Sequence, residues 1–139
     1  MRVAHFIQRY PPALGGSEAY FARLSRHLAA AGDHVCVFTT TAVELEAFWG
    51  TRGRCLRPGV AAEDGVEVRR YGLWRCAGQR RLLRALHLFP GHTWQCLTVP
   101  CNPLAPGMWR DCGRADVPFD VVHASAFPYG WLIACGRRW

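Results

Sequence analysis

The sequence predicts an α/β domain with a doubly wound parallel sheet, because short apolar runs alternate with amphipathic stretches along the chain. The first unit is the clearest: an apolar strand at 2–7, a helix from Ser17 and a second strand at 34–41. The connection between the two strands is long enough to make them parallel. At 139 residues the chain has the length of one domain.

The first helix is predicted from its cap, its charge and its periodicity. Ser17 is a typical N-cap residue, and Glu18 then lies in the first turn, where a negative charge favours the helix dipole. Gly32 is expected to end the helix in a left-handed conformation. The apolar residues between them recur at spacings of three and four and form one stripe: Phe21, Leu24, Leu28 and Ala31.

Two further strands complete the predicted sheet. Residues 65–71 alternate, with Val66 and Val68 on one face, which predicts a strand that is exposed or at the edge. Residues 119–127 form a fourth apolar run that ends in small and polar residues. Residues 42–65 match no element well.

Further helical segments are expected at 78–89, around 104–114 and from 129 to 138. The segment 78–89 is amphipathic, with Leu82, Leu83, Leu86 and Phe89 on one face and Arg80, Arg81, Arg84 and His87 on another. It lies in the most basic part of the chain, residues 51–90, which hold nine Arg against three acidic residues.

The formal net charge is +7, and all 17 basic residues are Arg, since the chain contains no Lys. So uniform a preference is a bias of composition, and aromatic residues do not interleave with the arginines as a nucleic-acid stacking platform requires. We therefore expect no nucleic-acid partner.

The seven cysteines do not form a metal or disulfide pattern, because their number is odd and no C-x-x-C occurs. Cys36 and Cys135 lie in apolar runs and are expected to be ordinary buried thiols. No metal site is predicted. No apolar run is long enough to span a membrane or to form a secretory signal, so we expect a cytoplasmic protein, including the inner face of the membrane.

The loop at 8–17 and the segment His123–Phe127 follow strands of the predicted sheet. Ligands of doubly wound sheets bind beyond these carboxyl ends. Gly15 and Gly16 let a backbone approach a ligand closely, and the following helix start favours an anion or a sugar hydroxyl. An ordinary strand-to-helix turn explains the glycines equally well. The loop is neither G-x-G-x-x-G nor a Walker A motif.

Two stretches resemble the family-four glycosyltransferases, which have the two-domain GT-B fold. The first is "MRVAHFIQRYPPALGGSEAYFARLSRHLAAAGDHVCVFTT", with its apolar strand, "PP", "GGSE" and leucine-rich helix. The second is "FDVVHASAFP" at 119–128. The sequence departs from the family at "GDHV", where Asp33 precedes the His, and residues 42–118 match only loosely. The resemblance implies a Rossmann-like domain.

The resemblance also implies roles for site residues. Backbone at Gly15 and Gly16 would contact the donor's phosphates or the acceptor, and Ser17 and Glu18 would support the loop and the helix start. His123 would lie near the transferred sugar as the catalytic candidate. The alternative for His123 is a structural histidine at a strand end.

By the same resemblance, residues 1–139 form the incomplete N-terminal, acceptor-side domain of a retaining enzyme. The full enzyme would transfer a sugar from a nucleotide-diphosphate donor to a glycan or lipid-linked acceptor, with no cofactor or metal. The family's second domain binds the nucleotide sugar through an Arg, a Lys and an E-x7-E pair. This chain has no Lys and no such pair. We therefore expect it to be inactive alone, as a gene fragment or as a subunit whose partner chain supplies the second domain.

Two other functions remain open from the sequence. The basic helix at 78–89, flanked by Trp74 and Phe89, is typical of a module that binds a membrane surface or a partner. A nucleotide-dependent oxidoreductase is disfavoured, because the glycine fingerprint is missing and no acidic residue ends the strand at 34–41.

Overall fold

The structure is a computed structural model, and it describes residues 1–91, 94–95, 98–100, 102–112 and 118–125. The strands are β1 (Arg2–Phe6), β2 (His34–Thr40), β3 (Gly59–Glu63), β4 (Val66–Tyr71) and β5 (Val121–Ala124). The helices are α1 (Gly16–Ala30), α2 (Gln79–Leu86) and α4 (Pro106–Cys112), with a 3-10 turn η1 (Leu45–Phe48).

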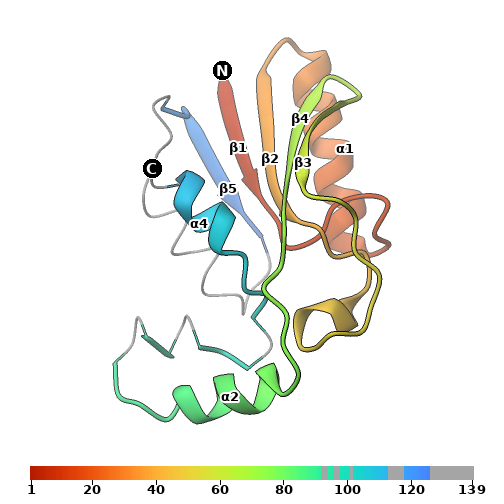
Figure 1. The fold of residues 1–139 in the computed structure, drawn as a ribbon. Coiled ribbons are helices and arrows are strands. Elements are labelled where there is room, and N and C mark those ends of the chain that lie inside the picture. The colour runs from red at the N-terminus through yellow and green to blue at the C-terminus, as the bar shows by residue number, and fades with distance from the viewer. Residues whose placement is uncertain (92–93, 96–97, 101, 113–117, 126–139) are drawn as a thin grey trace.

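One five-stranded sheet organises the chain, in the order β3-β4-β2-β1-β5 (Figure 1). β1 is parallel to β2 and to β5, and β2 is parallel to β4. α1 lies on one face of the sheet and α4 on the other (Figure 1). The predicted α/β, Rossmann-like and doubly wound fold is therefore confirmed, with the difference that β3 makes the sheet mixed.

The strand β3 was not predicted, and it corrects the expected place of β4. β3 pairs antiparallel with β4 and takes the outer position, so β4 is not an edge strand. The turn between them is Asp64–Gly65, and both residues have positive φ, 51° and 78°. Such a pair matches the twist of a tight hairpin. β3 itself, "GVAAE", is short and mostly exposed, so it lacks the apolar pattern of a core strand.

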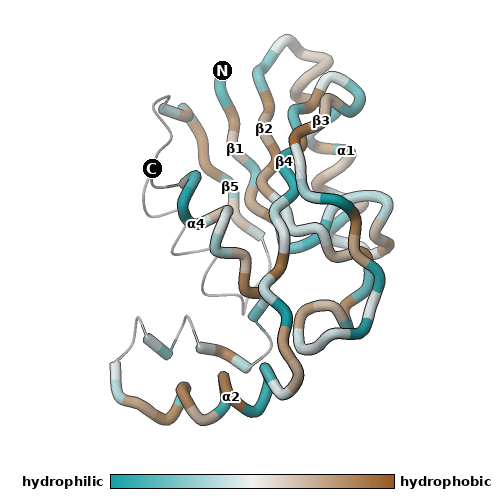
Figure 2. The backbone as a smooth tube through the Cα atoms, in the orientation of Figure 1, coloured by the Kyte–Doolittle hydropathy of each residue, from teal (hydrophilic) through white to brown (hydrophobic). Residues whose placement is uncertain are grey.

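The core has two layers because side chains alternate across the sheet. On the α4 face, Phe6 stacks on Phe38 with ring centroids 4.6 Å apart, and Met108 of α4 is fully buried with them. On the α1 face, Phe21 packs against valines of the strands, including Val35. Val66 and Val68 lie on one face of β4, as predicted, and both are fully buried there, although the strand was expected to be exposed or at the edge. Figure 2 shows how hydrophobic and hydrophilic residues follow one another along the elements.

α1 begins two residues earlier than predicted, because its N-cap residue is Gly15 and not Ser17. Gly15 occupies the N-cap position without a side-chain hydrogen bond, and Ser17 lies inside the helix, where its hydroxyl donates to Glu18 at 2.8 Å. Glu18 does lie in the first turn, as predicted. The physical reason is the buried carboxylate of Glu18, which occupies the space at the helix start that a capping side chain would use.

The buried face of α1 also differs from the predicted stripe. Its buried residues are Glu18, Phe21, Ala22 and Ser25, whereas Leu24 and Leu28 are half-buried and Ala31 is exposed. The predicted end is confirmed: Gly32 has φ 90°, and its N–H donates to the carbonyl of Ala29 at 3.0 Å. The next N–H, of Asp33, donates to Leu28, which completes a Schellman motif.

The other elements fall within their predicted ranges. α2 lies within 78–89, α4 within 104–114 and β5 within 119–127. Cys36 is fully buried, as expected, and its thiol donates to Glu67 Oε1 at 3.6 Å. The helix predicted from 129 to 138, and with it Cys135, lies outside the described residues.

Candidate functional site

The strand order reverses between β1 and β5. From β1 the sheet grows on one side through β2 and β4, and the chain then returns to pair β5 with the other side of β1. In open α/β sheets, the crevice beyond the carboxyl ends of the strands at this reversal is the usual ligand site. Both segments singled out from the sequence start here, the loop after β1 and the residues after His123. They are held together at Ser125, whose N–H donates to the carbonyl of Phe6 at 2.9 Å.

Two histidines meet at this position. His5 of β1 is in register with His123 of β5, and their ring centroids lie 5.5 Å apart. Phe21 of α1 packs against His123, with centroids 4.7 Å apart. His5 is buried at 1% exposure, and its Nδ1 lies 2.8 Å from the Ser25 hydroxyl. His123 is only half-buried, so it is the member of the pair that a ligand can reach.

The pKa of His5 is lowered to about 4, first by burial and then by the charge of the facing His123. A buried imidazole without a carboxylate partner is held neutral by the cost of desolvating its charged form. His5 is therefore a neutral structural group that packs behind His123. His123 was a candidate site residue from the sequence and His5 was not, because a histidine inside an apolar strand carries no functional signal of its own.

A buried ion pair supports the loop that leaves β1. Arg9 Nη2 lies 2.6 Å from Glu18 Oε1, and the two side chains are 11% and 2% exposed. Arg9 also donates to the carbonyl of Val43 at 3.1 Å, which ties the loop to the segment after β2. Through Arg9, Glu18 is joined to the loop after β1. Arg9 was missed, although it is the basic residue nearest to that carboxylate in the loop sequence.

The two glycines of "GGSE" have different surroundings. A Cβ built on Gly15 would lie 2.1 Å from Glu18 Oε2, while its φ of 167° is extended backbone open to any residue. A Cβ on Gly16 would meet nothing within 4 Å, and Gly16 is exposed. Gly15 therefore makes room for the Glu18 carboxylate, whereas Gly16 has open space where a side chain would be, and both glycines are exposed.

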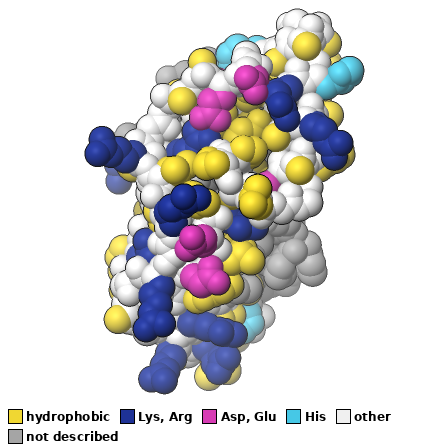
Figure 3. All heavy atoms as spheres, turned by 90° about the vertical axis from the view of Figure 1, so that its right-hand side faces the viewer, with side chains coloured by type: hydrophobic (Ala, Val, Ile, Leu, Met, Phe, Trp, Pro, Cys, Tyr) yellow, Lys and Arg dark blue, Asp and Glu magenta, His cyan; other side chains and the backbone are white. Residues whose placement is uncertain are grey.

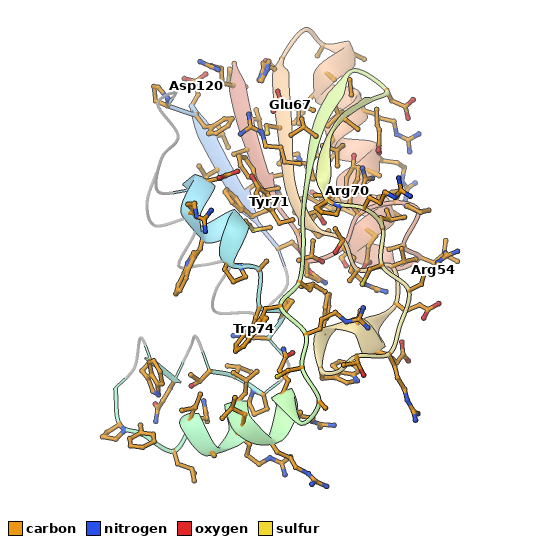
Figure 4. The ribbon with its side chains drawn as sticks, in the orientation of Figure 1. Arg54, Glu67, Arg70, Tyr71, Trp74 and Asp120 are labelled. Carbon is orange, nitrogen blue, oxygen red and sulfur yellow. The ribbon has the colours of Figure 1, made fainter. Side chains whose placement is uncertain are left out.

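The loop between these groups is anchored from the far side. Pro11–Pro12 is a cis peptide, and the carbonyl of Pro11 accepts from Arg70 Nη2 at 2.8 Å. Arg70 also makes a two-point contact with Glu63, at 2.6 and 3.0 Å (Figure 4). A hollow of about 380 Å³ lies between this loop and the outer side of α1, where Arg23 and Arg26 line it. The loop is therefore held in place by the hydrogen bond from Arg70.

Buried polar oxygens lie at the same ends of the strands. Within the described part of the chain, Gln8 Oε1 and Thr39 Oγ1 are buried and have no hydrogen-bond partner. Gln8 follows β1 directly, and Thr39 is near the end of β2. Buried polar groups are normally paired, so a water or a ligand hydroxyl is the natural partner of these oxygens.

A second hollow, of about 410 Å³, lies beside α2 and was not foreseen from the sequence. It is lined by Trp74, Trp94 and Trp109 among aliphatic side chains, and Figure 4 shows Trp74 on the connection from β4 to α2. Its polar lining side chains are already engaged: Gln79 donates to the Phe48 carbonyl at 3.1 Å, and Thr98 to the Trp94 carbonyl at 2.8 Å. The hollow is therefore suited to an apolar group.

The described residues hold no cluster of three or more His, Cys, Asp or Glu that is suited to a metal ion. None of the helices among them combines the length and the apolar character needed to cross a membrane.

The comparison with protein families matches one model, that of the glycosyl transferase 4-like domain, over residues 15–139. The match begins at Gly15 and includes His123. No curated protein matches the chain.

Proposed function

Because the chain belongs to the glycosyl transferase 4-like domain family, we propose that it forms the acceptor-side half of a retaining glycosyltransferase. The enzyme would take its sugar from a nucleotide-diphosphate donor and pass it to a glycan or a lipid-linked acceptor, with no metal. The observation that carries this proposal is the set of polar groups that follow β1 and β5: half-buried His123 and the buried Gln8 Oε1, which has no hydrogen-bond partner, with exposed Gly16 at the start of α1.

These groups suit hydroxyls better than phosphates. The positive end of α1 is already faced by the Glu18 carboxylate, whose charge is balanced by Arg9. A diphosphate placed there would meet that carboxylate, whereas a sugar hydroxyl can donate to Gln8 Oε1 and bond to the His123 ring. We therefore assign Gly16 and His123 to the acceptor, with Gly15, Ser17 and Glu18 as supporting residues.

The apolar hollow beside α2 supports the lipid-linked class of acceptor. The helix α2, which contributes lining residues to the hollow, lies at the end of the molecule where the strands have their carboxyl ends (Figure 1). An acceptor with a sugar head and an apolar chain would use both a polar and an apolar surface.

Binding of a sugar by this chain tests the acceptor assignment. We would titrate the chain with a panel of soluble methyl glycosides and follow binding by saturation-transfer NMR. His123→Gln and His123→Ala are expected to weaken the strongest binder by about tenfold, the worth of one good hydrogen bond. His34→Ala is the matched control, because His34 is the first residue of β2 and lies at the amino-terminal end of the parallel strands, away from His123. An equal loss in the His34 variant would contradict the assignment.

Transfer by the chain alone tests the division into halves. Charge develops on the leaving diphosphate in the transition state, and positioned cations normally stabilise it. The sequence has no Lys and no E-x7-E pair to serve the donor. We expect no sugar transfer above background when the 139-residue chain is mixed with nucleotide sugars and the glycoside that binds best. Turnover under those conditions would show that these residues hold a donor site.

A further inference from the structure

The helix α2 lies in a stretch of the sequence that carries positive charge without any negative charge. Residues 68–110 contain seven Arg and no Asp or Glu. Three of these arginines, Arg80, Arg81 and Arg84, belong to α2 and are exposed. None of the three pairs with an acidic side chain among the described residues. Figure 3 shows arginines gathered at the lower end of the molecule, where α2 lies in Figure 1.

These charges work against the helix that carries them. Arg80 and Arg81 lie in the first turn, which has no acidic residue, so both face the positive end of the helix dipole. Arg80 and Arg84 are also like charges at a spacing of four, which destabilises a helix. Places where a sequence breaks such local rules are commonly functional. A negative surface against α2 would turn these repulsions into attractions.

Apolar side chains stand next to the arginines. Leu88 lies in the turn after α2, two residues beyond the end of the helix, and it is 81% exposed. Phe89 beside it is 62% exposed. Ordinary charged partners, such as an acidic protein or a nucleic acid, give no reason for two large apolar side chains to project among the arginines.

We propose that α2 and the turn after it dock on a lipid bilayer with anionic headgroups. The partner is inferred from charge complementarity and from the apolar tip. Arg80, Arg81 and Arg84 would contact the headgroups, while Leu88 and Phe89 enter the boundary of the acyl chains, as in amphipathic helices that lie in the membrane plane. This inference goes beyond the proposed function, since it needs neither a sugar nor a second domain.

Co-sedimentation with vesicles tests the charge part of the proposal. The chain is expected to bind phosphatidylcholine vesicles that contain phosphatidylglycerol, and to bind pure phosphatidylcholine vesicles far less. Arg80→Gln with Arg84→Gln should lower the partition coefficient about twenty-fold, from roughly fivefold per arginine near an anionic surface. Arg23→Gln with Arg26→Gln removes the same charge from α1 and should change binding much less.

The apolar part needs its own variants. Leu88→Ser with Phe89→Ser should lower partitioning at least tenfold, with an unchanged melting temperature because both side chains are exposed. Leu14→Ser with Val60→Ser, which replaces two exposed side chains elsewhere, is the control. Equal losses in the α1 and α2 arginine pairs would overturn the proposal in favour of nonspecific attraction by net charge. No effect of the Leu88 and Phe89 variant would overturn it in favour of an anionic partner without an apolar layer. Neither result would bear on sugar binding.

Discussion

The two glycines of "GGSE" differ in whether a larger residue would fit: packing excludes a side chain at the first and leaves room for one at the second. Gly15 lacks a Cβ because the Glu18 carboxylate fills that space, and that carboxylate is held by buried Arg9. Gly16 has open space around it. From the sequence, both glycines were expected to let the backbone approach a ligand. Their different surroundings could not be predicted, because they depend on the rotamer of Glu18 and on its partner Arg9, nine residues earlier.

We predict that Gly15→Ala destabilises the chain by about 1–3 kcal/mol, because the new methyl group displaces a carboxylate that cannot move without losing Arg9. Gly16→Ala is the matched control. It should be neutral or stabilising by up to about 1 kcal/mol, since alanine replaces glycine in a helix with free space. Urea unfolding measures both. In a Glu18→Ala background, the cost of Gly15→Ala should fall to near zero, and a cost that persists there would contradict this account.

His5 should make the stability of the fold depend on pH. Its pKa is about 4 in the folded chain and about 6.5 when unfolded, so the unfolded chain binds the proton more readily. The stabilisation is present in full above pH 6.5 and is lost as the pH falls toward 4, by roughly 3 kcal/mol in all. Urea unfolding across this window measures the slope. His5→Phe should flatten it, and an unchanged slope in that variant would assign the effect to other groups.

At the scale of elements, the loop after β1 is an anchored structure. Arg70, at 9% side-chain exposure, joins its Pro11 carbonyl to Glu63 of the β3–β4 hairpin. The β3–β4 hairpin thus positions the arginine that holds the loop after β1. Its turn was visible in the sequence as "EDGV", because Asp-Gly is a strong hairpin signal, but β3 was hidden because small exposed residues carry no strand periodicity.

We predict that Arg70→Met costs about 2 kcal/mol in urea unfolding, since it removes charge-assisted bonds that are mostly buried. It should also speed hydrogen exchange at the Ala13 amide, which donates to the Tyr10 carbonyl inside the loop. Arg69→Met is the control: its side chain is 36% exposed and pairs with Glu67 at 2.5 Å. Faster exchange at Ala13 in both variants would mean that the effect is a general loss of stability.

Other element-level expectations succeeded or failed for identifiable reasons. Except for β3, the strands followed from their apolar or alternating patterns, α2 from its periodicity and the Gly32 end of α1 from glycine's left-handed conformation. The Ser17 cap failed because a tertiary ion pair at Glu18 took the place of a local hydrogen bond. The burial of Ser25 in place of Leu24 was not predicted, because the partner of Ser25 is His5 of β1, which it meets only when α1 packs on the sheet.

At the scale of the whole molecule, the fold gives the site its position. The strand order reverses between β1 and β5, and this reversal brings His123 beside His5 across more than a hundred residues of sequence. The sequence predicted both strands and both flanking segments, but pairing of β5 with β1 is a topological fact that no local pattern encodes. The apolar hollow beside α2 was likewise hidden, since its tryptophans lie in three separate segments.

The central claim is that a sugar binds beyond the carboxyl ends of β1 and β5. Amide chemical shifts of the isotope-labelled chain, titrated with the methyl glycoside that binds best, test it most directly. The account predicts that the largest shifts occur at Gly16, His123 and Ser125. The amides of His34 and Gly65, at the amino-terminal ends of β2 and β4, should not shift. Shifts confined to those amino-terminal ends, or shifts around α2 without any at His123, would contradict it.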